Sequence, residues 1–455
     1  MTVKASERGT FSSKMGIILA SAGSAVGLGN VWRFPTEVGN SGGAAFILIY
    51  IACVVLLGLP LMVAEFTVGR HTHANTVDAY RRLAPGTPWV AQGYLGVFTS
   101  WFILCYYSVV AGWTLKYLVA SALAGPAGIS GNTAYFESFT ASPVEPIAYM
   151  VAVMAVCHVV IARGVEKGIE RSSKLLMPLL LLIIAMLVVC SFSMPGSEAG
   201  LRFLLQPDFS CLTSDVVLSA MGQSFFSLSI AMGCLCTYAS YFRDDARLMR
   251  TAVSVASIDT TVAVMSGFII FPAVFSVADV EVSAGPGLVF ITLPNVFRMA
   301  FASVPWLGWL FAMLFYMLLL LAALTSMMSI HEPTTAFLLE HFRWPRRVAT
   351  RVVTLSCVAV GSLCSLSFGV LSGLRVGGLT LFELFDFISA KIFLPVGGLI
   401  IALFVGWRLP RRVVWEQATN GGTLRTRTFG LYMLLLRWVA PIAIVLIFCN
   451  ELGLL

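Results

Sequence analysis

The chain has 455 residues, of which 58% are hydrophobic and only 11% carry a charge, and its mean hydropathy is +0.89. A soluble protein of this length needs far more charged side chains to cover its surface, so the composition excludes a soluble class and favours a membrane protein. The net charge of +7 comes mainly from loops between apolar segments. That placement indicates membrane topology rather than nucleic-acid binding.

Eleven apolar runs follow one another along the chain, each long enough to cross a hydrocarbon core of about 30 Å as a helix. They occupy residues 15–37, 44–69, 89–123, 146–163, 172–192, 216–241, 248–277, 304–339, 347–372, 380–407 and 429–450. Short polar loops separate them, whereas a β-barrel would show runs of about ten residues with period-two alternation. The sequence therefore predicts an all-α integral membrane protein of about eleven transmembrane helices in a single domain, residues 1–455.

The basic residues predict the orientation of these helices. With the N-terminus in the cytoplasm, 22 of the 29 Lys and Arg residues lie on the cytoplasmic side. Only Arg202, Arg298 and Arg375 lie in loops on the other side. This bias agrees with the tendency of Lys and Arg to remain in the cytoplasm, and an odd number of spans places the C-terminus outside.

The first run is interrupted by polar and small residues, since residues 22–33 read AGSAVGLGNVWR. A second interrupted run, QSFFSLSIAMGCLCTYASY, lies five spans later at 223–241. This spacing predicts a five-plus-five inverted repeat, 15–192 and 216–407, in which helices 1 and 6 are discontinuous and 429–450 is an extra helix. A broken helix offers free C=O groups to a cation and free N–H groups to a carboxylate. Close helix packing is an alternative use of the same glycines and serines.

The stretches AGSAVGLGNVWRFP, NSGGAAFILIY and GLPLMVAEFTVGR resemble the opening of the neurotransmitter:sodium symporter family, which transports amino acids and their derivatives with sodium. Later stretches resemble the family in the same order: YYSVVAGWTL, GVEKGIERSSKLLMP, GQSFFSLSIAMGCLCTYASY, GLVFITLPNVF, LAALTSMMSIHEP and FDF. The resemblance implies a sodium-coupled amino-acid symporter that works by alternating access. Eleven spans and short loops imply a bacterial member in the inner membrane, with a monomer sufficient for transport.

Two sodium sites follow from the resemblance. The first comprises the Ala25 carbonyl and the side chains of Asn30, Ser227 and Asp259, completed by the carboxylate of the substrate. The second comprises the carbonyls of Gly23, Val26 and Ala322 and the hydroxyls of Thr325 and Ser326. Both are all-oxygen sets, which suit a dehydrated sodium ion. An alternative for the two hydroxyls is a hydrogen bond to a carbonyl of their own helix.

The same resemblance implies the anion requirement and the substrate. Many relatives have Asn where this chain has Asp259, and chloride-dependent ones have Ser where it has Ala263, so we expect no chloride requirement. Gly27 replaces the aspartate of monoamine transporters, which favours an α-amino acid whose carboxylate is held near Gly27, Gly29 and Tyr107. Carbonyls around Ala25, Phe226 and Ser227, with Ser229 nearby, would hold the ammonium. A mostly apolar set would select a hydrophobic or aromatic L-amino acid: Ile103, Tyr107, Phe226, Met232, Ser326 and Ile330.

Gates are implied on both sides of the substrate. On the outer side, Arg33 and Asp386 resemble the pair of gate residues in this family. The residues that resemble the family's inner gate network are Arg8, Phe11, Tyr241 and Glu340. Glu65 resembles a buried glutamate that receives backbone N–H groups at the break of the first helix. Gly168 and Pro178 resemble a glycine-proline pair in the fifth span at which the helix unwinds to release sodium.

Other classes of protein fit the sequence less well. HEPTT at 331–335 lacks the second histidine of a zinc-protease motif, and no nucleophile elbow is present, so we expect no catalytic residues and no enzyme. A channel would need a continuous polar pore, whereas the polar residues here converge at points near the middle of the membrane. A membrane receptor that binds an amino acid without transporting it would use the same binding residues and stays open.

Overall fold

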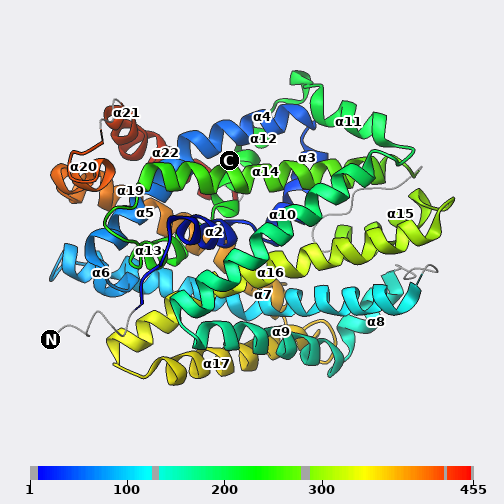
Figure 1. The fold of residues 1–455 in the computed structure, drawn as a ribbon, viewed down its shortest axis with the longest axis horizontal. Helices are drawn as coiled ribbons and strands as arrows, with labels where there is room; N and C mark the ends of the chain where they lie inside the picture. The colour runs from blue at the N-terminus through cyan, green and yellow to red at the C-terminus, as the bar shows by residue number, and fades with distance from the viewer. Residues whose placement is uncertain (1–8, 126–132, 278–286, 425–427, 452–455) are drawn as a thin grey trace.

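The computed structural model describes residues 9–125, 133–277, 287–424 and 428–451, and the segments between them are left out of the account below. The described residues are almost entirely helical, and their only β feature is an isolated bridge between Val376 and Leu379. Figure 1 shows long helices running roughly parallel to one axis, with short helices and loops gathered at the two ends. The predicted all-α class is confirmed.

Nine helical segments among the described residues are long and apolar enough to cross a membrane. They are α4–η2–α5 (Ala44–Thr72), α7 (Val90–Ala124), α9 (Glu145–Ala162), η4–α10 (Val165–Ser191), α14 (Leu248–Val274), α16 (Pro305–His341), α17 (Arg346–Leu366), α18–η7–α19–η8 (Leu381–Arg408) and α21–η9–α22 (Phe429–Asn450). Each coincides with a predicted run to within a few residues, apart from the start of the fifth span and the end of the ninth, because length and hydropathy alone define such segments.

The two remaining predicted runs are the ones interrupted by polar residues. In the first, α2 (Lys14–Ala25) is followed after three residues by η1 (Gly29–Arg33) and α3 (Phe34–Asn40), at a bend of 56°. In the other, α12 (Ser214–Ser227) and α13 (Cys234–Ala239) are separated by the non-helical residues 228–233. Both predicted discontinuities are present, while the repeat boundaries 15–192 and 216–407 stay a prediction.

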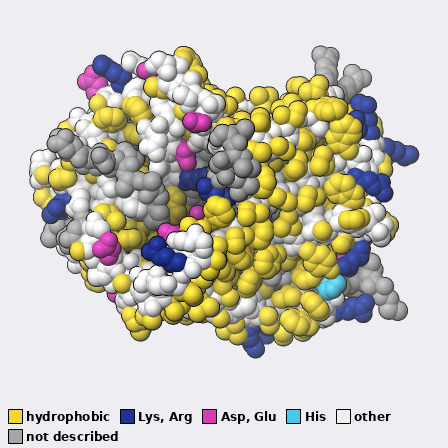
Figure 2. All heavy atoms as spheres, turned by 180° about the vertical axis from the view of Figure 1, so that it is seen from behind, with side chains coloured by type: hydrophobic (Ala, Val, Ile, Leu, Met, Phe, Trp, Pro, Cys, Tyr) yellow, Lys and Arg dark blue, Asp and Glu magenta, His cyan; other side chains and the backbone are white. Residues whose placement is uncertain are grey.

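Short elements cover the two ends of the bundle. One end, called here the α6 end, carries the start of the described chain with α6 (Thr76–Leu83) and α20 (Arg411–Thr419). The other, called the α15 end, carries α8 (Thr133–Ala141), α11 (Ser197–Leu205), η5 (Phe209–Cys211), η6 (Leu288–Thr292) and α15 (Leu293–Ala300). Figure 2 shows a broad hydrophobic surface between the ends, with Lys and Arg side chains along the edge at the α6 end. This distribution is typical of a multi-pass membrane protein.

The longest helices, α7 and α16, pack against each other through the middle of the molecule, and α2 packs against α10, α14 and α16. Small residues permit the closest approaches. A Cβ atom on Gly112 of α7 would lie 2.6 Å from the backbone nitrogen of Met150 in α9. Such contacts are how membrane helices gain packing energy when lipid removes most of the hydrophobic driving force. As a result of this close helix packing, both helix breaks lie deep inside the bundle.

The Gly112 contact gives a test of the fold. We expect Gly112→Val to destabilise the protein by about 1–3 kcal/mol or more, because the added carbons would overlap the backbone of α9. Gly430→Val in α21 is the matched control, since no atom of the described residues lies within 4 Å of a Cβ placed there. Thermal unfolding of the detergent-purified variants measures the difference, and equal melting temperatures would contradict the predicted α7–α9 contact.

Candidate functional site

Side chains satisfy the backbone at the break between α2 and η1. The chain leaves the helix at Val26, whose backbone is extended, and the N–H of Gly27 donates to the Oδ1 atom of Asn30 at 2.9 Å. The next N–H, that of Leu28, donates to the Tyr107 hydroxyl at 3.1 Å. Lipid provides no such acceptors, so the break requires these polar partners.

The break between α12 and α13 is held by a buried carboxylate. Glu65 on α5 accepts from the N–H of Ala231 at 2.6 Å and from the N–H of Cys236 at 3.3 Å. Ser229 and Ala231 adopt positive φ angles of 53° and 68°, a conformation that costs non-glycine residues of order 1 kcal/mol or more. The expectation that Glu65 serves the first helix is wrong: it serves the sixth span, because α5 packs directly against α13.

A first polar cluster joins three predicted sodium ligands. Asp259 on α14 is fully buried, and its Oδ1 atom accepts from Asn30 Nδ2 at 2.7 Å. Its Oδ2 atom accepts from the Ser227 hydroxyl at 2.8 Å and from the Tyr50 hydroxyl at 3.3 Å. The fourth predicted ligand, Ala25, is the buried last residue of α2. The contact of Tyr50 with Asp259 was not predicted, because the sequence does not distinguish a tyrosine with a polar partner from one that only packs in the core of the span 44–69.

A second polar cluster lies between α2 and α16. The Ser326 hydroxyl lies 3.1 Å from the Val26 carbonyl and 3.5 Å from the Gly23 carbonyl, so it bridges the two helices. The Thr325 hydroxyl instead donates to Leu321 and Ala322 of its own helix at 3.1 and 3.0 Å. The alternative of a bond within the helix therefore holds for Thr325 and not for Ser326. All five predicted members of the second sodium site are buried, and a Cβ atom on Gly23 would lie 3.2 Å from the Thr325 Cβ atom, so the α2 and α16 members lie together.

The residues predicted to hold the substrate lie beside these clusters. A Cβ atom on Gly27 would lie 2.7 Å from the Ser326 hydroxyl and 3.1 Å from the Tyr107 hydroxyl, and one on Gly29 would lie 3.0 Å from the Phe226 ring. A side chain at position 27 would therefore force the Ser326 or Tyr107 side chain to shift. Ile103, Met232 and Ile330 are buried side chains, and the Ser229 hydroxyl donates to the Ser24 carbonyl at 2.7 Å.

A cavity of about 350 Å³ approaches these residues from the α15 end. Its lining includes Tyr107, Phe226 and the predicted gate residues Arg33 and Asp386. The Arg33 guanidinium lies 4.7 Å above the Phe226 ring, and its Nε atom lies 3.9 Å from a Glu37 carboxylate oxygen. Arg33 and Asp386 thus share one cavity, where charges of both signs surround an aromatic floor.

Contacts of the predicted inner network are seen at two places among the described residues. Phe11 packs against Tyr238, Tyr241 and Phe242, and its N–H donates to the Tyr241 carbonyl at 3.1 Å. Glu340 accepts at 2.9 Å from both the backbone and the side chain of Asn75. Arg8 lies outside the described residues.

The sequence interpretation missed a buried ion pair beside Tyr241. The Tyr241 hydroxyl donates to Glu332 at 2.8 Å, and Glu332 also pairs with Arg346. Glu332 belongs both to the HEPTT stretch and to the family-like stretch LAALTSMMSIHEP, neither of which assigns it a role. Its polarity within a span was the available signal, since a buried carboxylate needs a partner.

The predicted glycine-proline pair spans a local departure from α-helical geometry. Gly168 lies in the π-helical turn η4 (Val165–Glu170), and Pro178 lies inside α10 (Arg171–Ser191). Glu170, at the end of this turn, accepts from the Ser12 backbone and from the Ser12 and Ser13 hydroxyls at 2.7–2.8 Å. The π-turn therefore also holds the segment that leads into α2.

Two discontinuous helices, buried oxygen clusters at their breaks and a cavity leading to those breaks are the features expected of a secondary transporter. The chain belongs to the sodium:neurotransmitter symporter family, whose model matches residues 8–128 and 140–454. It is therefore a member of a family of sodium-dependent transporters.

Individual relatives agree over nearly the full length. The chain is 38% identical over 448 residues to the uncharacterized sodium-dependent transporter YhdH of Bacillus subtilis, with 98% of each chain covered. It is 34% identical to an uncharacterized sodium-dependent transporter of Haemophilus influenzae, covering 99% of this chain and 100% of the relative. Among solved structures, MhsT in complex with L-phenylalanine matches with a TM-score of 0.87 and 41% identity, covering 98% of this chain and 100% of MhsT.

The role of Glu65 can be tested directly. We expect Glu65→Gln to lower sodium-driven uptake at least tenfold and to destabilise the fold by about 1–3 kcal/mol. The reason is that each carboxylate oxygen of Glu65 accepts from one backbone N–H, whereas the Gln side chain has a single acceptor oxygen. Glu198→Gln, at an exposed position in α11, is the control. Uptake by proteoliposomes and thermal unfolding measure the two effects; wild-type behaviour in both would contradict this account of the α12–α13 break.

Proposed function

We propose that the protein is a symporter that uses a sodium gradient to import a hydrophobic or aromatic L-amino acid across a bacterial inner membrane, with its N-terminus in the cytoplasm and its C-terminus outside. The observation that carries the proposal is the cluster of Asn30, Ser227 and Asp259 beside the helix break at Gly27. In this proposal the cluster supplies oxygen ligands to a cation, and the adjacent break supplies N–H groups to a carboxylate.

At the proposed first sodium site, a cation would take the place of the donors that now face Asp259. The carboxylate is fully buried, and a buried charge is costly unless a counter-charge or several hydrogen bonds compensate it. The Asn30 amide and the Ser227 hydroxyl can turn oxygen atoms toward sodium, and the Ala25 carbonyl lies at the helix end. The carboxylate of the substrate completes the set, which couples the ion to the substrate.

At the proposed second site, sodium would bind between α2 and α16. Ser326 already faces the carbonyls of Gly23 and Val26, so its oxygen and theirs converge on one volume. The Thr325 hydroxyl donates its proton to its own helix, which leaves a lone pair free for a cation. An ion there would hold the two helices together and favour one conformation of the carrier.

The class of substrate that we propose is inferred from Gly27 and from the apolar side chains near it. The Gly27 and Leu28 N–H groups now donate to Asn30 and Tyr107, and in the proposal the carboxylate of an α-amino acid takes over as their acceptor, with no side chain of residue 27 in the way. The buried Ile103, Met232 and Ile330 suit an apolar side chain. Support comes from MhsT, whose solved structure contains L-phenylalanine.

Uptake into proteoliposomes tests the function as a whole. We expect radiolabelled Leu, Trp or Tyr to accumulate above equilibrium when sodium is higher outside, and to equilibrate only slowly when potassium replaces it. Ala, with a smaller apolar side chain, should accumulate less. Saturable binding without accumulation would favour the receptor alternative, and neither binding nor uptake would overturn the amino-acid assignment.

The carboxylate at Asp259 leads us to expect that uptake does not require chloride. Replacing chloride by gluconate should change uptake less than twofold, because the carboxylate itself supplies the negative charge beside the first sodium ion. We expect Asp259→Asn to weaken sodium activation at least tenfold, since it removes that charge. Asp215→Asn, at an exposed position in the first turn of α12, is the control. Collapse of wild-type uptake in gluconate would contradict chloride independence.

A further inference from the structure

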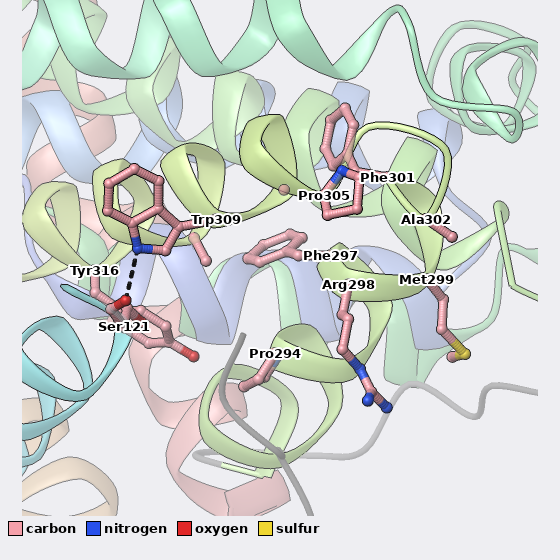
Figure 3. A pocket seen from close by; sticks show the side chains of 12 residues that line it. Ser121, Pro294, Phe297, Arg298, Met299, Phe301, Ala302, Pro305, Trp309 and Tyr316 are labelled. Carbon is pink, nitrogen blue, oxygen red and sulfur yellow. Dashed lines mark hydrogen bonds between the residues drawn. The ribbon is translucent and has the colours of Figure 1, made fainter. Parts of the chain in front are cut away.

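The helices α7 and α16 border a cavity near each of their ends. Near the α15 end, the cavity in Figure 3 is also bordered by α15 and the turn after it, and the Trp309 indole of α16 donates to the Ser121 carbonyl of α7 at 2.8 Å. Near the α6 end, a groove of about 620 Å³, called here the α7–α16 groove, is lined by residues of these two helices alone. Its residues Tyr94 and Phe98 are 43% and 47% exposed, so the groove opens to the surroundings of the bundle.

The wall of the α7–α16 groove suits a hydrocarbon chain. It consists of Tyr94, Leu95, Val97, Phe98, Trp101, Thr334, Phe337 and Leu338. Apart from the Tyr94 hydroxyl, its polar side-chain atoms have partners within the protein: the Thr334 hydroxyl donates to the Val97 carbonyl at 3.3 Å, and the Trp101 indole donates to the Ser356 hydroxyl at 3.0 Å. A polar solute would therefore gain little here. From Tyr94 to Trp101 the groove follows about two turns of α7, or about 10 Å, which lies within the hydrocarbon of one leaflet.

Aromatic residues indicate the level at which lipid headgroups would lie. The His341 ring stacks on Phe337 at a centroid distance of 4.9 Å, and Phe342 contacts His341 and Trp344 at 4.8 and 5.4 Å. Trp344, just beyond the end of α16, is exposed, as is Tyr94. Trp and Tyr side chains are enriched at the interface between hydrocarbon and water. The mouth of the groove is therefore expected at this interface.

An arginine is held at the mouth of the groove. Arg81 on α6 donates to the Tyr94 hydroxyl at 3.1 Å and pairs with Asp78 at 2.7 Å. A guanidinium has five N–H donors, so these contacts hold the group beside the groove and leave donors for a phosphate group.

The loop after α16 adds positive charge. Arg343 and Arg347 are exposed there and form no ion pair within the described part of the chain. The neighbouring Glu340 already accepts two hydrogen bonds from Asn75. The surroundings of the mouth therefore carry more positive than negative charge, which attracts an anionic headgroup.

We propose that the α7–α16 groove binds an anionic phospholipid from the leaflet at the α6 end, which is the cytoplasmic leaflet in the proposed orientation. One acyl chain lies in the groove, and the phosphate pairs with Arg81. From the groove, α7 continues to Tyr107, and α16 carries Ser326 before it reaches the groove. The lipid would thus contact both helices that border the proposed substrate site, although its binding does not depend on that proposal.

Native mass spectrometry of the full chain in detergent tests the site. The probe is palmitoyl-oleoyl phosphatidylglycerol, and the zwitterionic phosphatidylethanolamine with the same chains is the comparison. We expect the first phosphatidylglycerol to bind about fivefold or more tightly, since a basic side chain near an anionic headgroup contributes about 1 kcal/mol. Equal affinities for the two lipids, or no retained lipid, would overturn the proposal.

Two variants separate the headgroup contact from the chain contact. Arg81→Gln should reduce the preference for phosphatidylglycerol to less than about twofold, because it removes the charge that pairs with the phosphate. Leu338→Trp should weaken both lipids at least fivefold by filling the groove. Thermal unfolding checks that each variant is folded.

The matched controls carry the same substitutions elsewhere. Arg412 is an exposed arginine at the α6 end that pairs with Glu416, and Leu363 is an exposed residue of α17 outside the groove. Arg412→Gln and Leu363→Trp should bind both lipids like the wild type. A lipid preference and affinity that the two groove variants leave unchanged would overturn the proposal. The proposed transport function is tested separately, because this experiment measures no uptake.

Discussion

Hydrocarbon offers no hydrogen bonds to an opened helix, and this constraint governs the centre of the molecule. The two breaks release backbone groups that only protein can satisfy. Asn30 and Tyr107 accept from the first break, and Glu65 accepts from the second. These polar side chains are therefore needed before any solute binds. Their presence in turn makes the same region suited to ions, since hydroxyl, amide and carbonyl oxygens are also groups that bind hard cations.

Glu65 and Asp259 show how two buried carboxylates can differ in function. The partners of Glu65 are backbone N–H groups, one in the break and one in the first turn of α13, where the helix dipole also favours a negative charge. Those donors are fixed by the fold, so Glu65 acts structurally. The partners of Asp259 are an amide and two hydroxyls on side chains, which can reorient. A carboxylate with exchangeable donors is the one that suits a transient cation.

Much of the fold could be predicted because it depends on local sequence properties. Hydropathy and length located the spans, and glycines with Ser and Asn in mid-run located both breaks. The remaining details depend on tertiary contacts that one sequence does not encode in a pattern. Which break Glu65 serves depends on the packing of α5 against α13, and Thr325 and Ser326, though adjacent, face different partners because a helix turns about 100° per residue. The Glu332–Arg346 pair joins two helices across a loop, with no spacing rule to predict it.

The arrangement of the second cluster explains how an ion could affect the conformation of the whole carrier. Its atoms come from α2, which ends at a break, and from α16, which is continuous over 37 residues. The Ser326 hydroxyl meets the Gly23 and Val26 carbonyls only when the two helices are in contact. If an ion bound between a helix that ends at a break and a continuous helix, it would have all its ligands in one relative position of the two helices. It would lose some of them when the helices moved apart. The binding energy of an ion at the proposed site would therefore depend on that position, which is the differential affinity that any coupled transport cycle requires.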